Sequence, residues 1–373
     1  MNQKGKTSPR EPRALEEVFK TLLTLVLVCI SSVSLANEGQ KGLVSKLNYP
    51  FVSADDSPTP FGIIRLLRQE GLLPDCLFDA DGLTPKAEAI QVSEVILKVD
   101  GYLEPYGKIY NVSFNLAFFN SSVHSEENSF RQVFVIKYFT SADVKEIKKL
   151  TQVQESPLSK LPMQDRSFPV MSLYEKIFFY KTKEKLHSLI LLHSARGKMV
   201  ETFFKEVLSN QKDIAQQEQN ALEHLRLARR AFYRTGQAAA KLHLRFRADS
   251  NKESQKLLTQ VHGDYHSGNI FFDSKSDRIY FIDNETMAES LDRPQYFGKD
   301  IEDFIKNLAY SETDENRSLV TSLYNDFVEG YLSKVPESMR SQIKTEIETI
   351  FKDIRSNRTS TMTLRHHTQA LYK

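Results

Sequence analysis

Residues 260–285 have the sequence QVHGDYHSGNIFFDSKSDRIYFIDNE, in which short apolar segments alternate with polar loops. The pattern predicts a strand over 270–272, a turn over 273–277 and a second strand over 279–282. Polar side chains collect at the ends of these strands: His262, Asp264, His266, Asn269 and Asp283. Carboxylate and amide oxygens suit Mg²⁺, which binds proteins through one or two carboxylates together with phosphate oxygens. A carboxylate that is not a ligand, such as Asp264, is then free to orient and deprotonate an attacking hydroxyl.

The HGDYHSGN motif, with an aspartate fourteen residues after its asparagine, resembles the aminoglycoside phosphotransferase/choline kinase family of kinase-like enzymes. The spacing from Asp264 to Asn269 is also that of the protein-kinase catalytic loop. The resemblance implies that Asp264 is the catalytic base and that Asn269 and Asp283 hold Mg²⁺, with ATP as the phosphate donor. We add His266, two residues after Asp264, as a second catalytic candidate. The resemblance covers roughly residues 92–310.

A lysine that contacts the nucleotide phosphates is expected before this motif. Lys137 ends the strand-like segment Val-Ile-Lys and resembles the kinase-fold lysine of the third strand. Such a lysine needs a carboxylate partner on the following helix. Glu155, which begins an E-x-x-L-x-x-L run, is our choice, and Glu146 is the alternative.

The base of the nucleotide should lie against the segment 189–194, which resembles the hinge that binds adenine through backbone groups. Leu191 and Leu192 are the residues we expect to contact it. The phosphate-covering loop should lie near 101–107, where two glycines six residues apart match the family only weakly. Asn284 departs from the family, many members of which have tryptophan after the metal-binding aspartate.

Two further features resemble structural parts of the family. The sequence QAAAKLH over 237–243 is similar to the helix that ends in Leu-His just before the catalytic loop, although an ordinary buried helix fits the same residues. Asp300 resembles the aspartate that braces the loop, and Asp303 is a weaker candidate for that role.

The remaining pattern predicts an α+β fold. Residues rich in Val, Ile, Phe and Tyr predict five strands, over 92–99, 109–119, 132–139, 169–180 and 187–194. Helical spacing of apolar residues predicts helices that include 61–73, 143–161 and 221–244. With the resemblance, this order implies a bilobal protein-kinase-like fold with a small antiparallel β-sheet N-lobe and a mainly helical C-lobe.

The expected domain boundaries follow from this reading. Residues 1–36 form a signal peptide or a short membrane anchor, and residues 37–91 form an N-terminal helical extension. The N-lobe covers 92–194, and the helical C-lobe covers 195–373 with its catalytic loop at 262–283.

The first 36 residues differ in composition from the rest of the chain. The net charge of the 373 residues is +2, and residues 1–36, with five basic and three acidic side chains, account for all of it. The neutral body therefore has no global electrostatic attraction for nucleic acid or for an anionic membrane. The uncharged segment TLLTLVLVCISSVSLA at 21–36 is shorter than the ~20 residues that span a bilayer, and it ends in small residues. We expect an exported or secreted protein, with a membrane-anchored or a cytoplasmic protein as alternatives and a buried core helix as the other reading of this segment.

Two sequence details bear on that location. The chain has only two cysteines, Cys29 and Cys76, so it lacks a disulfide framework or a zinc-site spacing. Asn284-Glu-Thr286 would be a glycosylation sequon beside the metal site if the chain entered a eukaryotic secretory lumen. That position favours bacterial export or a cytosolic destination.

The predicted function is phosphorylation, dependent on ATP and Mg²⁺, of a hydroxyl on a small molecule such as an amino alcohol, a sugar or an aminoglycoside. Residues 283–315 hold ten acidic and three basic side chains, which would suit a cationic acceptor, although a solvated surface together with the Mg²⁺ ligands is the simpler explanation. One alternative is an exported effector-type kinase that acts on a protein or a lipid. The other is a catalytically weak nucleotide-binding module, suggested by the poor glycine loop.

Overall fold

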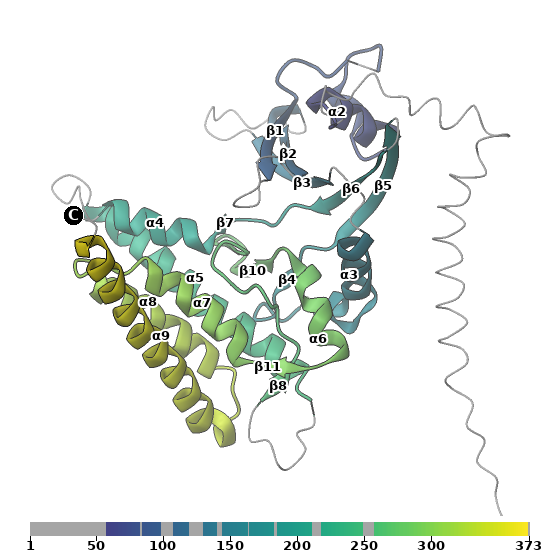
Figure 1. Cartoon of the computed structure of the whole chain (residues 1–373). Coiled ribbons are helices and arrows are strands. Elements are labelled where there is room, and N and C mark those ends of the chain that lie inside the picture. The colour runs from purple at the N-terminus through teal and green to yellow at the C-terminus, as the bar shows by residue number, and fades with distance from the viewer. Residues whose placement is uncertain are drawn as a thin grey trace, which may run out of the picture. The chain divides into compact units, whose positions relative to one another are not determined.

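The computed structural model describes residues 57–82, 84–97, 107–118, 130–139, 144–162, 164–182, 185–210, 218–248 and 257–371 (Figure 1). The chain divides into two compact units, one made of residues 1–75 and 180–186, the other of residues 76–179 and 187–373. The predictions for residues 1–36, and for most of the loop at 101–107, lie outside the described residues. Within the described ranges, no helix combines the length and the apolar character that crossing a bilayer requires.

The first unit contains the helix α2 (Pro60–Gln69). Thr59 caps it, because its side chain accepts a hydrogen bond from the Gly62 amide at 3.1 Å, and the proline at its first position has no amide to leave unpaired. The predicted helix over 61–73 is therefore confirmed but ends earlier, at a left-handed Gly71 with φ of 70°.

Five strands, which together span the expected N-lobe, form one sheet in the order β1-β2-β3-β6-β5. Their bounds are β1 (Ile90–Leu97), β2 (Gly107–Asn115), β3 (Phe130–Phe139), β5 (Tyr174–Thr182) and β6 (Lys185–His193). β2 pairs antiparallel with β1 and β3, and β3 pairs antiparallel with β6. The helix α3 (Val144–Glu155) contributes Leu150 to a cluster with three buried residues of β3 and β6, which holds it against the sheet. Short 3₁₀ turns follow β2 (Leu116–Phe118) and α3 (Pro157–Lys160).

The predicted single strand over 169–180 is wrong, because the chain divides it between two sheets. β4 (Val170–Met171) pairs in parallel with β10 (Arg278–Phe281) of the predicted hairpin, and only β5 joins the five-stranded sheet. Ser172 stands at the crossing, since its amide continues the β4–β10 pairing by donating to the Phe281 carbonyl at 2.8 Å. A segment from the expected N-lobe therefore belongs to the sheet that carries the site.

The predicted hairpin is confirmed as β9 (Ile270–Asp273) and β10, paired antiparallel. The small sheet has the order β4-β10-β9-β7, with β7 (Lys198–Met199) directly after the hinge. A two-stranded ribbon joins β8 (Leu258–Thr259) to β11 (Gln295–Tyr296). After β10 come a 3₁₀ turn η5 (Asn284–Met287) and a short helix α6 (Ala288–Asp292).

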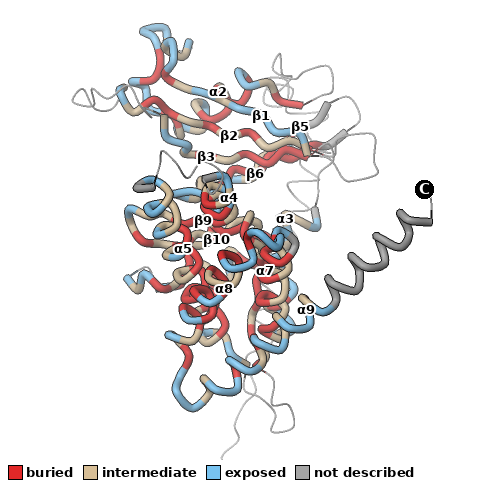
Figure 2. Tube along the Cα trace, turned by 90° about the vertical axis from the view of Figure 1, so that its left-hand side faces the viewer, coloured by how far each residue is buried: buried red, intermediate tan, exposed pale blue. Residues whose placement is uncertain are grey.

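Five long helices build the rest of the second unit: α4 (Val200–Asn210), α5 (Glu218–Arg245), α7 (Gly298–Tyr310), α8 (Arg317–Leu332) and α9 (Glu337–Leu371). α5 packs against α4 and α8, and α7 packs against α9 (Figure 1). Glycines bring α5 and α8 close, since a Cβ on Gly236 would overlap the Phe327 carbonyl. Buried segments run through α5, α7 and α8, where Phe304 stacks on Phe327 with ring centroids 4.5 Å apart (Figure 2). The described residues therefore have an α+β fold, with an antiparallel β-sheet and a mainly helical remainder, as expected.

Candidate active site

The catalytic loop between β8 and β9 is anchored by one buried aromatic residue. Tyr265 is fully buried, and its hydroxyl donates to the Thr235 carbonyl of α5 at 3.1 Å. Its ring lies 5.3 Å from that of Phe281, centroid to centroid, and burial raises the pKa of its hydroxyl well above the usual value. Because Tyr265 is held inward, its neighbours Asp264 and His266 remain partly exposed on the surface of the loop.

Asp300 at the start of α7 braces this loop, and its predicted role is confirmed. Its carboxylate accepts hydrogen bonds from the backbone amides of His262 at 2.8 Å and Gly263 at 2.9 Å, and lies 3.0 Å from His243 Nε2. Burial by itself would raise the pKa of Asp300, but the hydrogen bond and charge of His243 and the amide of Gly263 lower it. Asp303, the weaker candidate, makes no hydrogen bond to the described part of the loop. The Leu-His end of α5 thus has a structural purpose that the helix pattern alone did not show.

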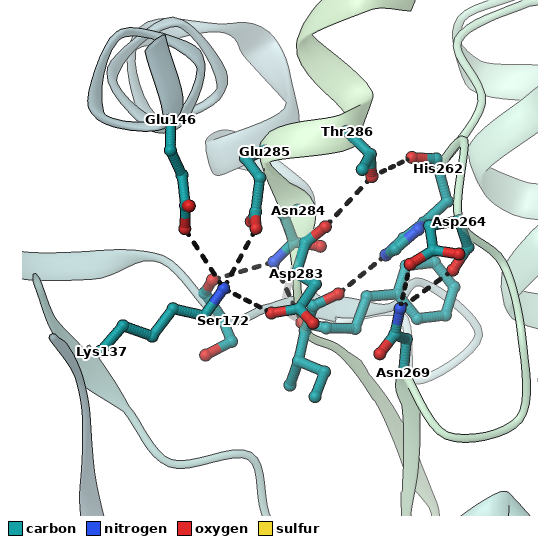
Figure 3. A network of polar contacts seen from close by, with 12 residues as sticks. Lys137, Glu146, Ser172, His262, Asp264, Asn269, Asp283, Asn284, Glu285 and Thr286 are labelled. Atoms are coloured by element: carbon teal, nitrogen blue, oxygen red, sulfur yellow. Dashed lines mark hydrogen bonds and ion pairs between the residues drawn. The ribbon is translucent and has the colours of Figure 1, made fainter. Parts of the chain in front are cut away.

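Asp264 is positioned by Asn269, five residues later. The Asn269 amide nitrogen donates to Asp264 Oδ2 at 2.9 Å and to the Asp264 carbonyl at 3.1 Å (Figure 3). The Asp264 side chain is 51 % exposed, which leaves its other oxygen open to an incoming group. His266 Nδ1 accepts the Gly268 amide at 3.1 Å, so Nε2 carries the proton of the neutral ring and lies 3.7 Å from Asp264 Oδ2. The distance is too long for a hydrogen bond, and a catalytic role for His266 stays a prediction.

Lys137 of β3 contacts three carboxylates (Figure 3). Its Nζ lies 2.6 Å from Asp283 Oδ1, 3.0 Å from Glu285 Oε1 and 3.4 Å from Glu146 Oε1. Burial alone would lower the pKa of Lys137, but the negative charges of Glu285, Asp283 and Glu146 outweigh burial and raise it. The lysine is therefore charged and is held next to the predicted metal ligand.

The choice of Glu155 as the lysine's partner is wrong, and the alternative, Glu146, is correct. Both residues lie on α3, but Glu155 is its last residue and is exposed. At 1.5 Å and 100° per residue, Glu155 lies about 14 Å further along the axis and on the opposite side of the helix. Glu285 was missed altogether. Its signal in the sequence was its position two residues after Asp283, at the end of a stretch already singled out.

Asp283 and Asn284 link β10 to the turn η5. Asp283 has a left-handed backbone with φ of 55°, which costs energy for a residue with a Cβ and persists only where neighbours hold it. Asn284 supplies that support: it is fully buried, and its amide nitrogen donates to the carbonyls of Ser172 at 2.8 Å and Phe281 at 3.0 Å. The same nitrogen would carry the glycan of the sequon. A glycan at Asn284 is therefore incompatible with the folded site.

A cavity of about 250 Å³ lies beside these groups. Lys137, Asp283 and Glu285 lie at its polar part. Its apolar walls come from the five-stranded sheet, from β9 and from the end of β10: Val95, Ile109, Val135, Leu192, Phe271 and Ile282. An apolar slot with a charged end suits a purine ring attached to phosphates.

The hinge prediction needs a correction of register. Leu192 lines the cavity, but Leu191 does not. The lining continues instead into His193 and Ser194, the last two residues of the predicted segment, and into Ala195 directly after it. A close backbone approach ends the hinge: Gly197 has φ of 90°, and a Cβ there would overlap the Phe272 carbonyl.

Gly107, the second glycine of the expected phosphate loop, is required by the packing of two strands. Gly107 is the first residue of β2, and a Cβ there would overlap the carbonyl of Tyr138 in β3. Gly101 and the residues up to 106 lie outside the described residues.

The residues present fit a divalent cation bound together with phosphate. Asp283 supplies a carboxylate, and Asn269 keeps its side-chain oxygen available because its nitrogen is turned to Asp264. Glu285 Oε2 is buried and accepts no hydrogen bond from any described residue, and three carboxylates face a single ammonium group. No cluster of three or more His, Cys, Asp or Glu side chains suited to a metal occurs in the described part of the chain. Two protein ligands completed by phosphate and water are what Mg²⁺ commonly accepts.

Comparisons with known proteins give matches among solved structures alone. No family model matches the chain, and no curated protein matches it. The solved structures that match include a glucosamine kinase in complex with glucosamine, ADP and inorganic phosphate, at 10% identity and a TM-score of 0.34, covering 71% of this chain and 86% of that one. They also include the Drosophila melanogaster PAN3 pseudokinase, at 11% identity and a TM-score of 0.33, covering 76% of this chain and 70% of that one. One neighbour is an enzyme and the other a pseudokinase, so the chemistry has to be argued from the residues of this chain.

Proposed function

We propose that this chain is a phosphotransferase that uses ATP and Mg²⁺ to phosphorylate a hydroxyl of a small molecule, such as an amino alcohol, a sugar or an aminoglycoside. One observation carries the proposal. Asp264, positioned by Asn269, and Asp283 lie at the same hairpin. Lys137, from the distant strand β3, contacts Asp283 beside the cavity. A polar hairpin without a function would not need a buried lysine from another sheet.

The chemistry requires positioning more than covalent help. Lys137 would turn its ammonium group from Asp283 to the phosphates of ATP, while Glu146 and Glu285 keep it in place. When bound, Mg²⁺ would neutralise developing charge on the phosphates and would be held by Asp283 and Asn269. Asp264 would accept the proton of the acceptor hydroxyl as its oxygen bonds to the γ-phosphorus and the bond to the β,γ-bridging oxygen breaks, which releases ADP.

The acidic surplus of residues 283–315 does not by itself select a cationic acceptor. Asp283 and Glu285 hold Lys137, and Asp300 braces the catalytic loop. Glu289 pairs with Lys149 at 2.8 Å, and Glu302 pairs with a lysine on its own helix. The proposal of a small acceptor rests instead on the open side of Asp264.

The test is a measurement of ADP release by the full chain with ATP and a panel of amino alcohols, sugars, nucleosides and aminoglycosides. We expect turnover that requires Mg²⁺, is stimulated by one acceptor class and is lost in Asp264→Ala. Turnover that is unchanged in Asp264→Ala would overturn the proposal. Phosphorylation of added proteins or lipids but of no small molecule would favour the effector-type kinase, and ATP binding without product would favour a nucleotide-binding module.

Export through the segment 21–36 is a separate proposal. The burial of Asn284 supports a route that does not glycosylate the chain, either bacterial export or retention in the cytosol. N-terminal sequencing of the natural protein tests it, because a cleaved leader would leave a new terminus near residue 37.

A further inference from the structure

Ser172 lies in the wall of the cavity, beside the predicted hinge. Ser172 and His193 both line this cavity, and Ser172 Oγ donates a hydrogen bond to the His193 carbonyl at 2.8 Å. His193 ends β6 at the hinge. The next residue, Ser194, donates its amide to Val133 of β3, so the chain stays paired with the sheet directly after the His193 carbonyl.

The main chain of Ser172 is fixed, but its hydroxyl can rotate. Its amide donates to Phe281, and its carbonyl accepts the Asn284 side chain at 2.8 Å. The residue is 9 % exposed. A serine hydroxyl has one donor and two acceptor positions and turns to suit its neighbour, while a carbonyl oxygen has two lone pairs. The hinge therefore presents an acceptor next to a group that can donate or accept.

This pair matches both kinds of purine. With position 6 of the base facing the Ser172 hydroxyl, a 6-amino group can donate to Oγ while the hydroxyl keeps its hydrogen bond to the His193 carbonyl. A 6-oxo group in the same place can instead accept the hydrogen of the hydroxyl, which rotates away from the carbonyl. A hinge with carbonyl oxygen alone would leave O6 unpaired, which is unfavourable inside a cavity.

We propose that the Ser172 hydroxyl makes this site accept purine nucleotides with either an amino or an oxo group at position 6, so that inosine and guanosine triphosphates replace ATP. The inference rests on the proposed function, because it concerns the base of the same phosphate donor. Asn284, which stands where many members of the similar family have tryptophan, contributes indirectly because its side chain holds the main chain of Ser172.

The test compares the Mg²⁺ complexes of ATP and inosine triphosphate as competitors of a fluorescent nucleotide bound to the full chain. We expect the dissociation constants of the wild-type protein for the two nucleotides to differ by less than about tenfold. In Ser172→Ala, the binding of inosine triphosphate should become about tenfold weaker relative to the binding of ATP. Ser172→Thr keeps a hydroxyl and should restore the wild-type ratio. The control is Ser159→Ala, since that hydroxyl also donates to a backbone carbonyl, of Ser156 at 2.9 Å, but outside the cavity.

Two results would overturn the inference alone. One is a wild-type protein that binds ATP more than about a hundredfold better than inosine triphosphate. The other is a Ser172→Ala variant that binds both nucleotides with an unchanged ratio. Failure of the wild-type chain to bind any of these nucleotides would overturn the proposed function together with the inference.

Discussion

The catalytic loop and the lysine cluster are held in different ways. The loop at 260–269 is fixed by buried hydrogen bonds to Asp300 and by the buried ring of Tyr265. Among the described residues, the Lys137 ammonium group is held by ionic contacts, and one of its partners, Asp283, is the residue that we propose as a ligand of the cation. Under the proposed function, Asp264 would be positioned in advance, and Lys137 would exchange Asp283 for the phosphates when the nucleotide binds.

Replacing the base should give the largest effect. Asp264→Asn removes the proton acceptor, and we expect the turnover number to fall by about 10²–10⁴. Because the Asp264 side chain is half exposed, the melting temperature should remain close to that of the wild type. The same substitution at exposed Asp292 in α6 is the control and should leave turnover intact. A variant at Asp264 with nearly full activity would show that the loop is not built around a base.

Removing the Asp300 carboxylate, which braces the loop, should mainly lower the stability of the fold. Asp300→Ala leaves two backbone amides and His243 without their buried acceptor, and we expect the free energy of unfolding to fall by about 3 kcal/mol in urea denaturation. Asp314→Ala, which removes an exposed ion pair with Arg317, should change it by less than about 0.5 kcal/mol.

The difference in unfolding free energy between the wild type and Asp300→Ala should depend on pH, because the pKa of Asp300 is lowered in the folded state. A carboxyl whose pKa is lower in the folded state stabilises the fold above its unfolded pKa of about 4, and this contribution is lost as pH falls through the folded value. The gap in stability between the wild type and Asp300→Ala should therefore narrow on acidification below about pH 4. A gap that is constant down to pH 2 or so would mean that Asp300 contributes through packing alone.

The lysine cluster should respond more weakly. Glu146→Gln removes one of three negative charges around Lys137, and we expect kcat/KM for ATP to fall about tenfold. Glu155→Gln changes an exposed residue at the far end of the same helix and should have no measurable effect. Equal losses in the two variants would contradict the ion pair seen here.

The sequence was sufficient where local pattern and motif spacing determine structure. Alternating apolar residues located β9 and β10, and the order of Asp264, Asn269 and Asp283 predicted the polar end of the hairpin. All of these features lie between residues 264 and 283, so few tertiary contacts are needed to bring them together.

Contacts between distant segments could not be found in this way. The choice between Glu146 and Glu155 depends on which face of α3 meets the sheet, and that is set by packing of residues such as Leu150. The division of 169–180 between two sheets depends on a hydrogen bond from Ser172 to β10, more than a hundred residues later. Both were decided by tertiary structure rather than by local propensity.

The central claim is that Asp264, Asn269, Asp283 and Lys137 together transfer a phosphate from ATP. Phosphorus NMR of the full chain with ATP, Mg²⁺ and the acceptor panel tests it most directly, because the γ-phosphate is followed to its product. We predict that the γ-phosphate signal declines and a phosphomonoester signal grows, both requiring Mg²⁺, and that Asp264→Asn abolishes the change. An unchanged γ-phosphate signal in the wild type, or the same product in wild type and Asp264→Asn, would contradict the claim.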